Sequence, residues 1–308
     1  MRSALLKRVS LTLMLLFAVG GATSLPARTH KKDIAIQLYS VRDLIDARIK
    51  SGETCRPILD ELAGMGYTAV ETADYRNGLF YGQTPADFRR DVEAAGMRVL
   101  SSHCTRTLSR EELETGDFSQ ALKWWDECIA AHKAAGMDYI VTPYMNVQTV
   151  GELDVYCRYY NEVGRRCNAA GLRYGYHNHS HELRKLDDGT VMLDYMLEHT
   201  DPECVFFEMD VYWMVIGKAS PVDYFHRYPG RFTILHIKDQ REIGQSGMVG
   251  FDAIFGHVSD AGVRHIVVEV ERYSYDDVMR SIRESMDYLR REPFVPASYT
   301  GRSRKSDK

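Results

Sequence analysis

The sequence predicts a single (β/α)₈ barrel preceded by a cleaved signal peptide. Short runs rich in β-branched and aromatic residues alternate with longer amphipathic stretches, the pattern of βα units around a parallel sheet. Several strands follow a helix that ends in glycine, as at Gly66, Gly96, Gly136, Gly171 and Gly262, because glycine accepts the left-handed conformation that ends a helix. Eight such units, spaced by roughly 30 residues, match a barrel of ordinary size. The structural alternative is a doubly wound sheet, but no G-x-G-x-x-G follows the first strand.

The N-terminal segment has the features of a secretory signal. Arg2, Lys7 and Arg8 precede an apolar run over residues 11–19, and small residues continue to Ser24. This order is typical of a signal peptide cleaved at Ser24 or Ala27, and the run is shorter than the roughly 20 apolar residues of a membrane anchor. We expect a signal peptide over residues 1–24 and a periplasmic or secreted protein, with no membrane insertion once the signal is removed.

The strands and helices of the mature chain follow from its hydrophobic periodicity. Strands are expected at residues 34–39, 68–72, 98–103, 139–144, 172–178, 205–210, 233–238 and 265–271. Apolar residues at three- and four-residue spacing predict helices over 86–95, 118–135, 150–170, 191–199 and 278–290. The barrel therefore covers residues 30–292. Residues 293–308 are rich in Pro, Ser, Gly and Lys and are expected to form a flexible tail.

The charge balance argues against a nucleic-acid partner. The chain has 39 Lys and Arg against 43 Asp and Glu, a formal net charge of −4. Removing residues 1–24 takes away three cations and no anion, so the mature chain carries 36 − 43 = −7. A protein this acidic has no overall field for gathering polyanions.

The cysteines show no framework of disulfides or zinc ligands. There are six of them, without a C-x-x-C pair or zinc-finger spacing. A chain of this length does not need disulfides to form a core, so we expect these cysteines to be mostly buried small apolar residues.

Polar side chains gather at the C-terminal ends of the expected strands, where the active sites of (β/α)₈ barrels lie. The set is Gln37, Tyr39, Glu71, His103, His177, Asn178, His179, Glu182, Glu208, Asp210, Trp213, His236, Lys238, Asp239, Glu269 and Glu271. Each has a structural explanation on its own; Glu208, for example, would simply pair with Lys238. Together, carboxylates and imidazoles at the ends of four successive strands are costly to bury. A divalent metal would offset that cost, and mixed His and carboxylate ligands suit Mn²⁺, Mg²⁺, Co²⁺ or Zn²⁺.

Four of these segments carry a resemblance to a known family. They are residues 176–182 (YHNHSHE), 207–213 (FEMDVYW), 235–239 (LHIKD) and 268–271 (VEVE). They resemble the xylose isomerase-like TIM-barrel superfamily of sugar phosphate isomerases and epimerases. That group includes inosose dehydratases, ketose 3-epimerases and AP endonucleases of the endonuclease IV type. The resemblance covers nearly the whole mature chain, and it specifies the superfamily rather than the reaction.

The resemblance implies one divalent metal held by a Glu, an Asp, a His and a second Glu from late strands. Asp210, His236 and Glu269 match three of these ligands. The family's remaining Glu stands on the fifth strand, where this chain has His177, so the pattern is broken there. We expect Glu182 to complete the site, with His177 or His179 as rival ligands.

The chemistry implied is removal of a proton next to the carbonyl of a small sugar. His179 and Glu271 are the expected proton-transfer groups, with Lys238 stabilising the developing oxyanion. Tyr39, His103, His177 and Trp213 would then line the sugar pocket.

Several outcomes and classes of protein remain open. Reprotonation of the intermediate gives an isomerase or epimerase, whereas expulsion of a β-substituent gives a lyase or dehydratase acting on a keto-glycoside or keto-inositol. Export and the lack of a glycine-loop phosphate cradle favour a non-phosphorylated substrate. A non-catalytic sugar-binding protein is the alternative of another class, because fold does not establish activity. The oligomeric state is not readable from the sequence.

Overall fold

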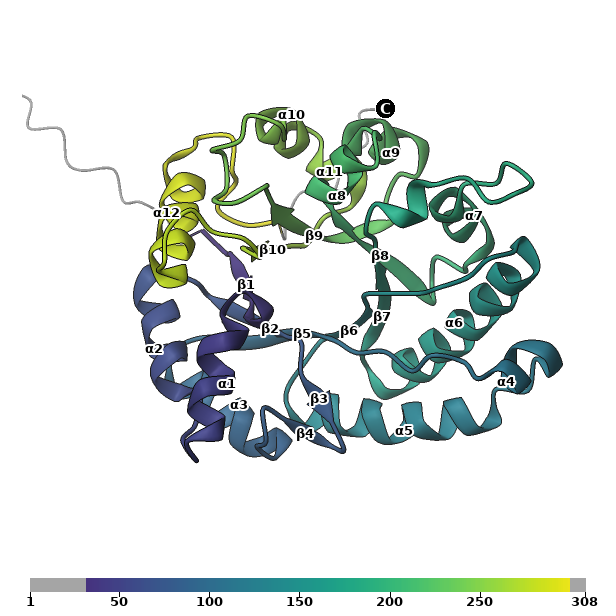
Figure 1. Ribbon diagram of the computed structural model, residues 1–308, viewed down its shortest axis with the longest axis horizontal. Helices are drawn as coiled ribbons and strands as arrows, with labels where there is room; N and C mark the ends of the chain where they lie inside the picture. Colours follow the sequence, from purple (N-terminus) through teal and green to yellow (C-terminus); the bar gives the residue numbers. More distant parts are fainter. Residues whose placement is uncertain (1–31, 300–308) are drawn as a thin grey trace, which may run out of the picture. The chain divides into compact units, whose positions relative to one another are not determined.

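Eight parallel strands close into a barrel in the computed structural model, which describes residues 32–299 (Figure 1). The strands are β1 (Ala35–Gln37), β2 (Ala69–Thr72), β5 (Arg98–His103), β6 (Tyr139–Thr142), β7 (Arg173–His177), β8 (Val205–Asp210), β9 (Phe232–Lys238) and β10 (His265–Glu269). Their order around the barrel is β1, β10, β9, β8, β7, β6, β5, β2. The final pairing, of Ala35 with Val267, closes the barrel. The predicted (β/α)₈ fold is confirmed.

Helices surround the strands in Figure 1. They are α1 (Arg42–Lys50), α2 (Arg56–Met65), α3 (Pro85–Ala94), α4 (Arg110–Thr115), α5 (Ser119–Ala134), α6 (Val150–Ala170), α7 (Met192–His199), α8 (Val211–Ile216), α9 (Pro221–Arg227), α10 (Phe251–Gly256), α11 (Val258–Ala261) and α12 (Val278–Arg291). The five helices expected from periodicity agree with α3, α5, α6, α7 and α12 to within a residue at each end. A two-stranded hairpin, β3 (Tyr75–Arg76) and β4 (Leu79–Phe80), follows β2.

The longest helix shows how local sequence sets the element boundaries. At the start of α6, the Thr149 side chain accepts a hydrogen bond from the Glu152 backbone N–H, and the Glu152 side chain accepts one from the backbone N–H of Thr149. This capping box satisfies backbone donors that the first turn leaves free. The helix ends at Gly171, whose φ of +84° is left-handed, and β7 begins directly after it.

Two apolar clusters hold the barrel. The smaller one fills the barrel interior with alternate side chains from the strands, among them Leu100, Phe206 and Ile234. The larger one lies between the strands and the surrounding helices and includes Trp125 and Phe225, both fully buried. Because the interior is filled in this way, a ligand on the barrel axis has to lie beyond the strand ends.

Four strands, β1, β6, β7 and β10, end earlier than the sequence predicted, and two of these differences move expected site residues. The first strand stops at Gln37, because the Gln37 side chain accepts a hydrogen bond from Tyr39 N at 3.1 Å and caps the 3₁₀ helix η1 (Leu38–Val41). The last strand stops at Glu269, so Glu271 lies in the loop that follows. Tyr39 therefore lies in a 3₁₀ helix and Glu271 in a loop, both at the rim of the barrel rather than in strands.

The C-terminal segment differs in part from the expected flexible tail over 293–308. Residues 293–299 pack onto the barrel: Val295 is buried, and Ala297 accepts a hydrogen bond from Asp33 N at 2.9 Å. The apolar side chain of Val295 explains the difference, because its burial holds a segment whose composition otherwise resembles a linker. Residues 300–308 and the predicted signal peptide lie outside the described residues. None of the described helices has the length and apolar content needed to span a membrane.

The six cysteines are all free and buried, as expected. They are Cys55, Cys104, Cys128, Cys157, Cys167 and Cys204. Most of them pack in the larger apolar cluster, in the manner of small apolar side chains.

Candidate active site

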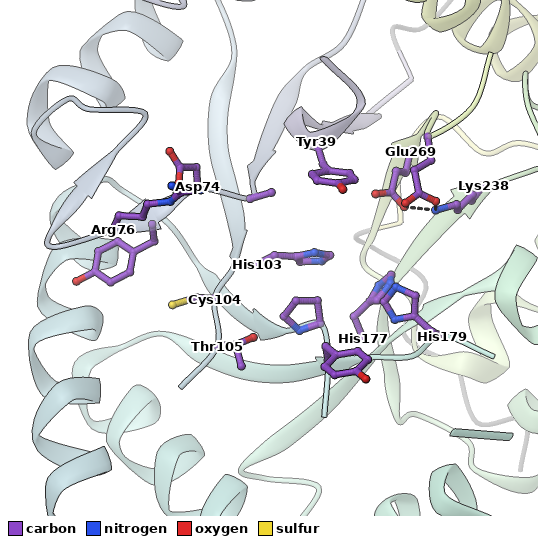
Figure 2. Close-up of a pocket in the computed structure, with 15 residues that line it drawn as sticks. Tyr39, Asp74, Arg76, His103, Cys104, Thr105, His177, His179, Lys238 and Glu269 are labelled. Atoms are coloured by element: carbon purple, nitrogen blue, oxygen red, sulfur yellow. Dashed lines mark hydrogen bonds and ion pairs between the residues drawn. The ribbon is translucent and has the colours of Figure 1, made fainter. Parts of the chain in front are cut away.

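A cavity of about 420 Å³ opens at the C-terminal ends of the strands (Figure 2). It is lined by Tyr39, Ala73, Asp74, Tyr75, Arg76, His103, Cys104, Thr105, Pro143, Tyr144, His177, His179, Lys238, Glu269 and Glu271. The residues that the sequence assigned to proton transfer, His179 and Glu271, and the residue assigned to stabilising the oxyanion, Lys238, all lie on its wall. The hairpin after β2 adds Tyr75 and Arg76, which sequence reasoning did not place in the site.

Three of the four residues expected to bind metal converge beside this cavity. One ligand atom from each of Asp210, His236 and Glu269 lies within 4.8 Å of the other two. Asp210 Oδ2 and His236 Nδ1 are buried and have no hydrogen-bond partner. Burial raises the pKa of Asp210 to about 7, a measure of how poorly this carboxylate is compensated. Unpartnered buried acceptors grouped in this way fit a divalent metal.

The second ring nitrogen of His236 supports the same arrangement. His236 Nε2 lies 2.7 Å from Glu71 Oε1. A carboxylate only accepts, so the N–H is assigned to Nε2 when Nδ1 is a ligand. Metal-binding histidines typically make this kind of bond to a carboxylate, which fixes the orientation of the ring. Although burial alone would lower it, the nearby carboxylates of Glu208 and Glu71 raise the pKa of His236 well above its usual value. The carboxylates around His236 therefore require a positive charge, which either a proton or a metal ion can supply.

Glu71 is held by further donors, all from the barrel interior. Its carboxylate accepts hydrogen bonds from Gln37 Nε2 at 2.8 Å and from Ser101 Oγ at 2.5 Å. Burial works to raise the pKa of Glu71, but His103, His236 and these hydrogen bonds outweigh it and lower the pKa to about 2. Glu71 was noted from the sequence as a strand-end carboxylate, without a role. One sequence signal could have pointed to this role beside His236: Glu71 is a single carboxylate within the buried, otherwise uncharged strand β2.

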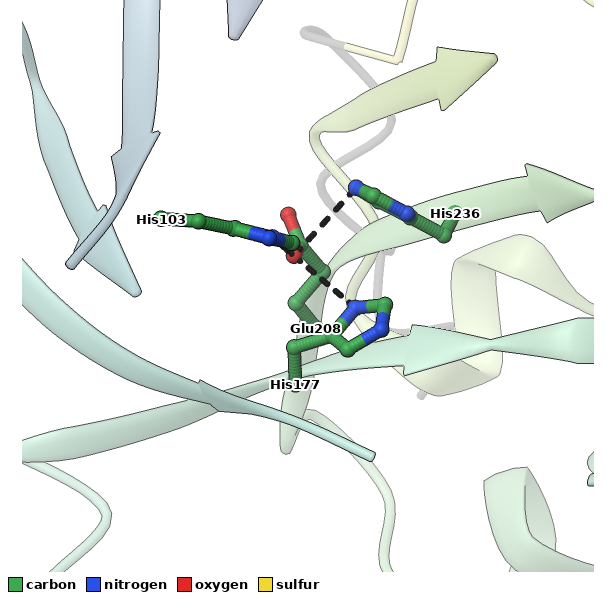
Figure 3. Close-up of side chains that lie close together, drawn as sticks. All are labelled: His103, His177, Glu208 and His236. Carbon is green, nitrogen blue, oxygen red and sulfur yellow. Dashed lines mark hydrogen bonds and ion pairs between the residues drawn. The ribbon is translucent and has the colours of Figure 1, made fainter. Parts of the chain in front are cut away.

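A second buried group surrounds Glu208 (Figure 3). The Glu208 carboxylate lies 2.7 Å from His103 Nε2, 3.1 Å from His177 Nδ1 and 3.4 Å from His236 Nε2. The alternative explanation of Glu208, a pairing with Lys238, is not found. Lys238 instead donates to Glu269 at 2.8 Å and to Glu271 at 2.6 Å, because its longer side chain reaches the rim while Glu208 stays one layer deeper in the barrel. The expected pocket residue His103 is thus also part of this network.

His177 and His179 occupy different places. His177 Nδ1 faces Glu208, so its Nε2, which lies 4.0 Å from Asp210 Oδ2, is the nitrogen that faces the metal-ligand group. Burial, together with His236, lowers the pKa of His177 well below its usual value. His179 lies on the cavity wall with Nδ1 buried and unpartnered. Burial and the neighbouring Lys238 lower the pKa of His179 to about 4, so its imidazole is neutral near pH 7.

The structure does not bring Glu182 into the metal-ligand group. The carboxylate of Glu182 accepts hydrogen bonds from the Tyr176 hydroxyl at 2.6 Å and from His179 N at 2.9 Å. It is fully buried, and burial raises the pKa of Glu182. Both oxygens serve to fix the turn after β7, and this turn positions His179.

Of the two aromatic residues expected to line the pocket, the structure places Tyr39 on the cavity wall but not Trp213. Tyr39 lines the cavity and is 40% exposed. Trp213 does not line it. Asp210 caps α8 by accepting from Trp213 N at 2.9 Å, and the indole then packs beside Lys238, whose Nζ lies 5.2 Å from the ring centre.

The closed barrel with a polar cavity at its C-terminal face has the architecture of a (β/α)₈-barrel enzyme. The chain belongs to the xylose isomerase-like TIM barrel family, whose model matches residues 59–292. This membership agrees with the resemblance inferred from the sequence motifs.

The chain is also similar to individual proteins with this fold. A sugar phosphate isomerase/epimerase from Parabacteroides distasonis is 30% identical, with a TM-score of 0.78 over 88% of this chain and 97% of that one. Inosose dehydratase from Geobacillus kaustophilus is 24% identical over 208 residues, 60% of this chain. The match spans 61% of the length of that curated relative. The IolI protein, solved with a bound zinc atom, shares the fold at 13% identity, with a TM-score of 0.63 over 83% of this chain and 95% of that one.

Proposed function

We propose that this chain is a divalent-metal-dependent enzyme that isomerises or epimerises a non-phosphorylated sugar or keto-sugar by removing a proton next to its carbonyl. The observation that carries the proposal is the convergence of Asp210, His236 and Glu269 beside the cavity, with Asp210 Oδ2 and His236 Nδ1 left without hydrogen-bond partners. A buried group of this kind is costly without a cation. Membership of a family that includes a sugar phosphate isomerase/epimerase supports the reaction class.

Asp210, His236 and Glu269 would hold the metal, and we assign the fourth position to His177 rather than Glu182. His177 is neutral and directs Nε2 toward Asp210, whereas both oxygens of Glu182 are engaged elsewhere. When bound, the metal polarises a carbonyl or hydroxyl oxygen of the substrate and stabilises the negative charge of the enediolate. The zinc-bound relative makes Zn²⁺ one candidate, and the ligand set also suits Mn²⁺, Mg²⁺ or Co²⁺.

Groups of the chain itself provide the proton transfer. His179 lines the cavity, is neutral near pH 7 and has an Nδ1 without a hydrogen-bond partner, so it can accept a proton. Glu271 lies at the rim, where Lys238 holds it at 2.6 Å. An epimerase needs one group to remove a proton and another to return it on the opposite face, and His179 and Glu271 are the two candidates. The carboxylates of Glu269 and Asp210 raise the pKa of Lys238 even though burial opposes them. Lys238 therefore stays cationic and can stabilise an oxyanion.

The charges along the cavity support a substrate without phosphate. Among the described residues that line the cavity, the cationic side chains of Arg76 and Lys238 are both already paired with carboxylates. Arg76 lies 2.7 Å from Asp74, and Lys238 contacts Glu269 and Glu271. A phosphate dianion would have to displace one of these pairs. We further propose that the protein is exported, on the basis of the signal peptide expected over residues 1–24. Sugar phosphates are mainly cytoplasmic metabolites, so export also supports a substrate without phosphate.

A lyase is the second candidate, because elimination begins with the same proton abstraction. The relative named inosose dehydratase favours it. In that case the enediolate would expel a β-substituent from a keto-glycoside or keto-inositol, and one of His179 and Glu271 would protonate the leaving group.

The test is metal analysis followed by proton NMR in D₂O with free sugars and 3-keto-glycosides. We expect one divalent metal per chain in the site and incorporation of deuterium next to a carbonyl; the product then separates epimerase from lyase. Asp210→Asn should lose this metal and the exchange while keeping the wild-type circular dichroism spectrum. A protein that binds these compounds but shows no exchange at full metal occupancy would instead be a sugar-binding protein.

A further inference from the structure

A second group of metal-binding side chains lies far from the cavity in the fold. His226 is near the end of α9, and His257 and Asp260 lie at the start and within α11. One ligand atom from each lies within 4.8 Å of the other two. Figure 1 shows α9 and α11 side by side, and the two helices pack against each other. They lead into β9 and β10 at the N-terminal face of the barrel, opposite the cavity.

We propose that His226, His257 and Asp260 form a second, peripheral site for Zn²⁺ or a similar borderline divalent metal. His226 Nε2 lies 3.2 Å from His257 Nδ1. Asp260 Oδ2 lies 3.1 Å from His257 Nδ1 and 3.8 Å from His226 Nε2. This proposal is independent of the function proposed above, because it shares no residue with the cavity.

These distances match a tetrahedral metal site. Zinc binds His nitrogen at about 2.0–2.1 Å and carboxylate oxygen at about 2.0–2.2 Å. In a tetrahedron with such bonds, neighbouring ligand atoms are about 3.3–3.5 Å apart. The three measured separations, 3.2, 3.1 and 3.8 Å, lie around that value. The rings of His226 and His257 are also nearly perpendicular, at 88°, so their nitrogens meet at one point without the rings stacking. Two imidazoles and one carboxylate leave the fourth position for water.

The backbone already holds the ligands in place. His257 and Asp260 are three residues apart on one helical turn, where Asp260 N donates to His257 O at 3.0 Å. The loop after α9 is tied to α11 by a hydrogen bond from Gly230 N to Asp260 O at 3.0 Å. Gly262 has a φ of +82°, and a Cβ there would approach Gly230 Cα to 2.8 Å, so this close contact requires glycine. A preformed group loses little freedom when a metal binds.

The site is open to solvent. The side chains of His226, His257 and Asp260 are 52%, 40% and 28% exposed. A metal can therefore enter without any opening of the fold. Once bound, it would join α9, which precedes the strand of His236, to α11, which precedes the strand of Glu269. These two strands carry proposed ligands of the cavity metal.

Zinc stoichiometry tests the proposal. The full chain is stripped with a chelator and dialysed against ZnCl₂, and zinc per chain is measured by mass spectrometry. We expect His226→Ala and His257→Gln each to bind one equivalent less than wild type. In the Asp210→Asn background, which removes a ligand of the cavity group, the peripheral equivalent should remain and should disappear only when His226→Ala is added. His199→Ala is the matched control: His199 is an exposed histidine outside the three-donor groups, stacked on Tyr195.

A spectroscopic reading gives a second criterion. Co²⁺ in the Asp210→Asn chain should show the visible absorption of a tetrahedral site, and His226→Ala should abolish it while the far-ultraviolet circular dichroism stays the same. Equal zinc content in wild type, His226→Ala and His199→Ala would overturn the proposal. Equal loss in His226→Ala and His199→Ala would also overturn it, because the binding would then be unspecific. If only the cavity site fails to bind metal, Asp210→Asn should bind as much zinc as wild type, and His226→Ala should still lose one equivalent.

Discussion

The substitution Glu71→Gln isolates the role of charge beneath the proposed metal site. Glutamine keeps the volume of Glu71 and can still accept from Gln37 and His236 through its amide oxygen. The amide nitrogen would replace Oε2 and donate to the Ser101 hydroxyl, which now lies 2.5 Å from that oxygen. The variant therefore removes the negative charge behind His236 Nε2 while keeping an acceptor for that N–H.

The expected effect follows from the position of Glu71. Its carboxylate holds His236 Nε2 at 2.7 Å, so His236 Nδ1 points to Asp210 and Glu269. Loss of such a partner typically lowers metal affinity by about 10- to 100-fold, which corresponds to ~1.4–2.7 kcal/mol. We expect Glu71→Gln to weaken metal binding by that factor, as measured by competition with a chromophoric chelator.

Glu242→Gln is a matched control for this experiment. Glu242 is also a fully buried, hydrogen-bonded carboxylate, held by Ser274 and Ser281 away from the cavity. It should lose folding stability in urea but keep the wild-type metal affinity. The reasoning is refuted if Glu71→Gln binds metal as tightly as wild type, or if Glu242→Gln weakens binding equally. The first result would mean that His236 needs no charged partner, and the second that the effect is general destabilisation.

Three further predictions concern separate parts of the chain. Glu271→Gln should keep its metal but lose turnover by about 10²–10⁴-fold; full activity in the metal-loaded variant would place the base elsewhere. Burial, together with the cationic side chains of Arg98 and Arg264, lowers the pKa of His265 to about 4, although the Asp33 carboxylate opposes this shift. The unfolded chain therefore binds more protons between pH 6.5 and 4, and stability falls as the pH drops through that window. Between pH 7 and pH 5, the free energy of unfolding measured in urea should fall by about 2 kcal/mol less in His265→Gln than in wild type. Identical pH profiles of the two proteins would contradict this assignment. Gly164→Ala should destabilise the fold by at least about 1–3 kcal/mol in urea, because its Cβ would lie 2.2 Å from the Cys204 carbonyl oxygen; an unchanged unfolding midpoint would show that α6 can shift.

The fold was predictable because its signals are local. A strand such as β8 is recognisable from its own residues, and a helix end such as Gly171 from its left-handed conformation. Alternation along a strand also placed His236 and Lys238 on one face. These features depend on a few neighbouring residues, so no knowledge of distant parts of the chain is needed to identify them.

The composition of the candidate site was predictable only in part. The sequence motifs selected Asp210, His236 and Glu269, and the structure brings these three together. The same reasoning placed Glu182 with them, although the turn after β7 directs its carboxylate to Tyr176 and His179. A carboxylate in a loop has no fixed face, so its direction depends on the hydrogen bonds that the folded turn offers.

The sequence by itself determined the number of βα units, the positions of their strands and the types of residue at the strand ends. Only the tertiary structure decided which of those residues meet. Glu71 and His236 are separated by 165 residues and come together across the interior of the closed barrel, as do Glu208 and His103. Periodicity fixes the face of a strand on which a side chain lies, because that depends on the local backbone. The depth and the partner of a side chain depend on its length and on the stagger between strands, because closing the barrel fixes the register of each strand relative to its neighbours.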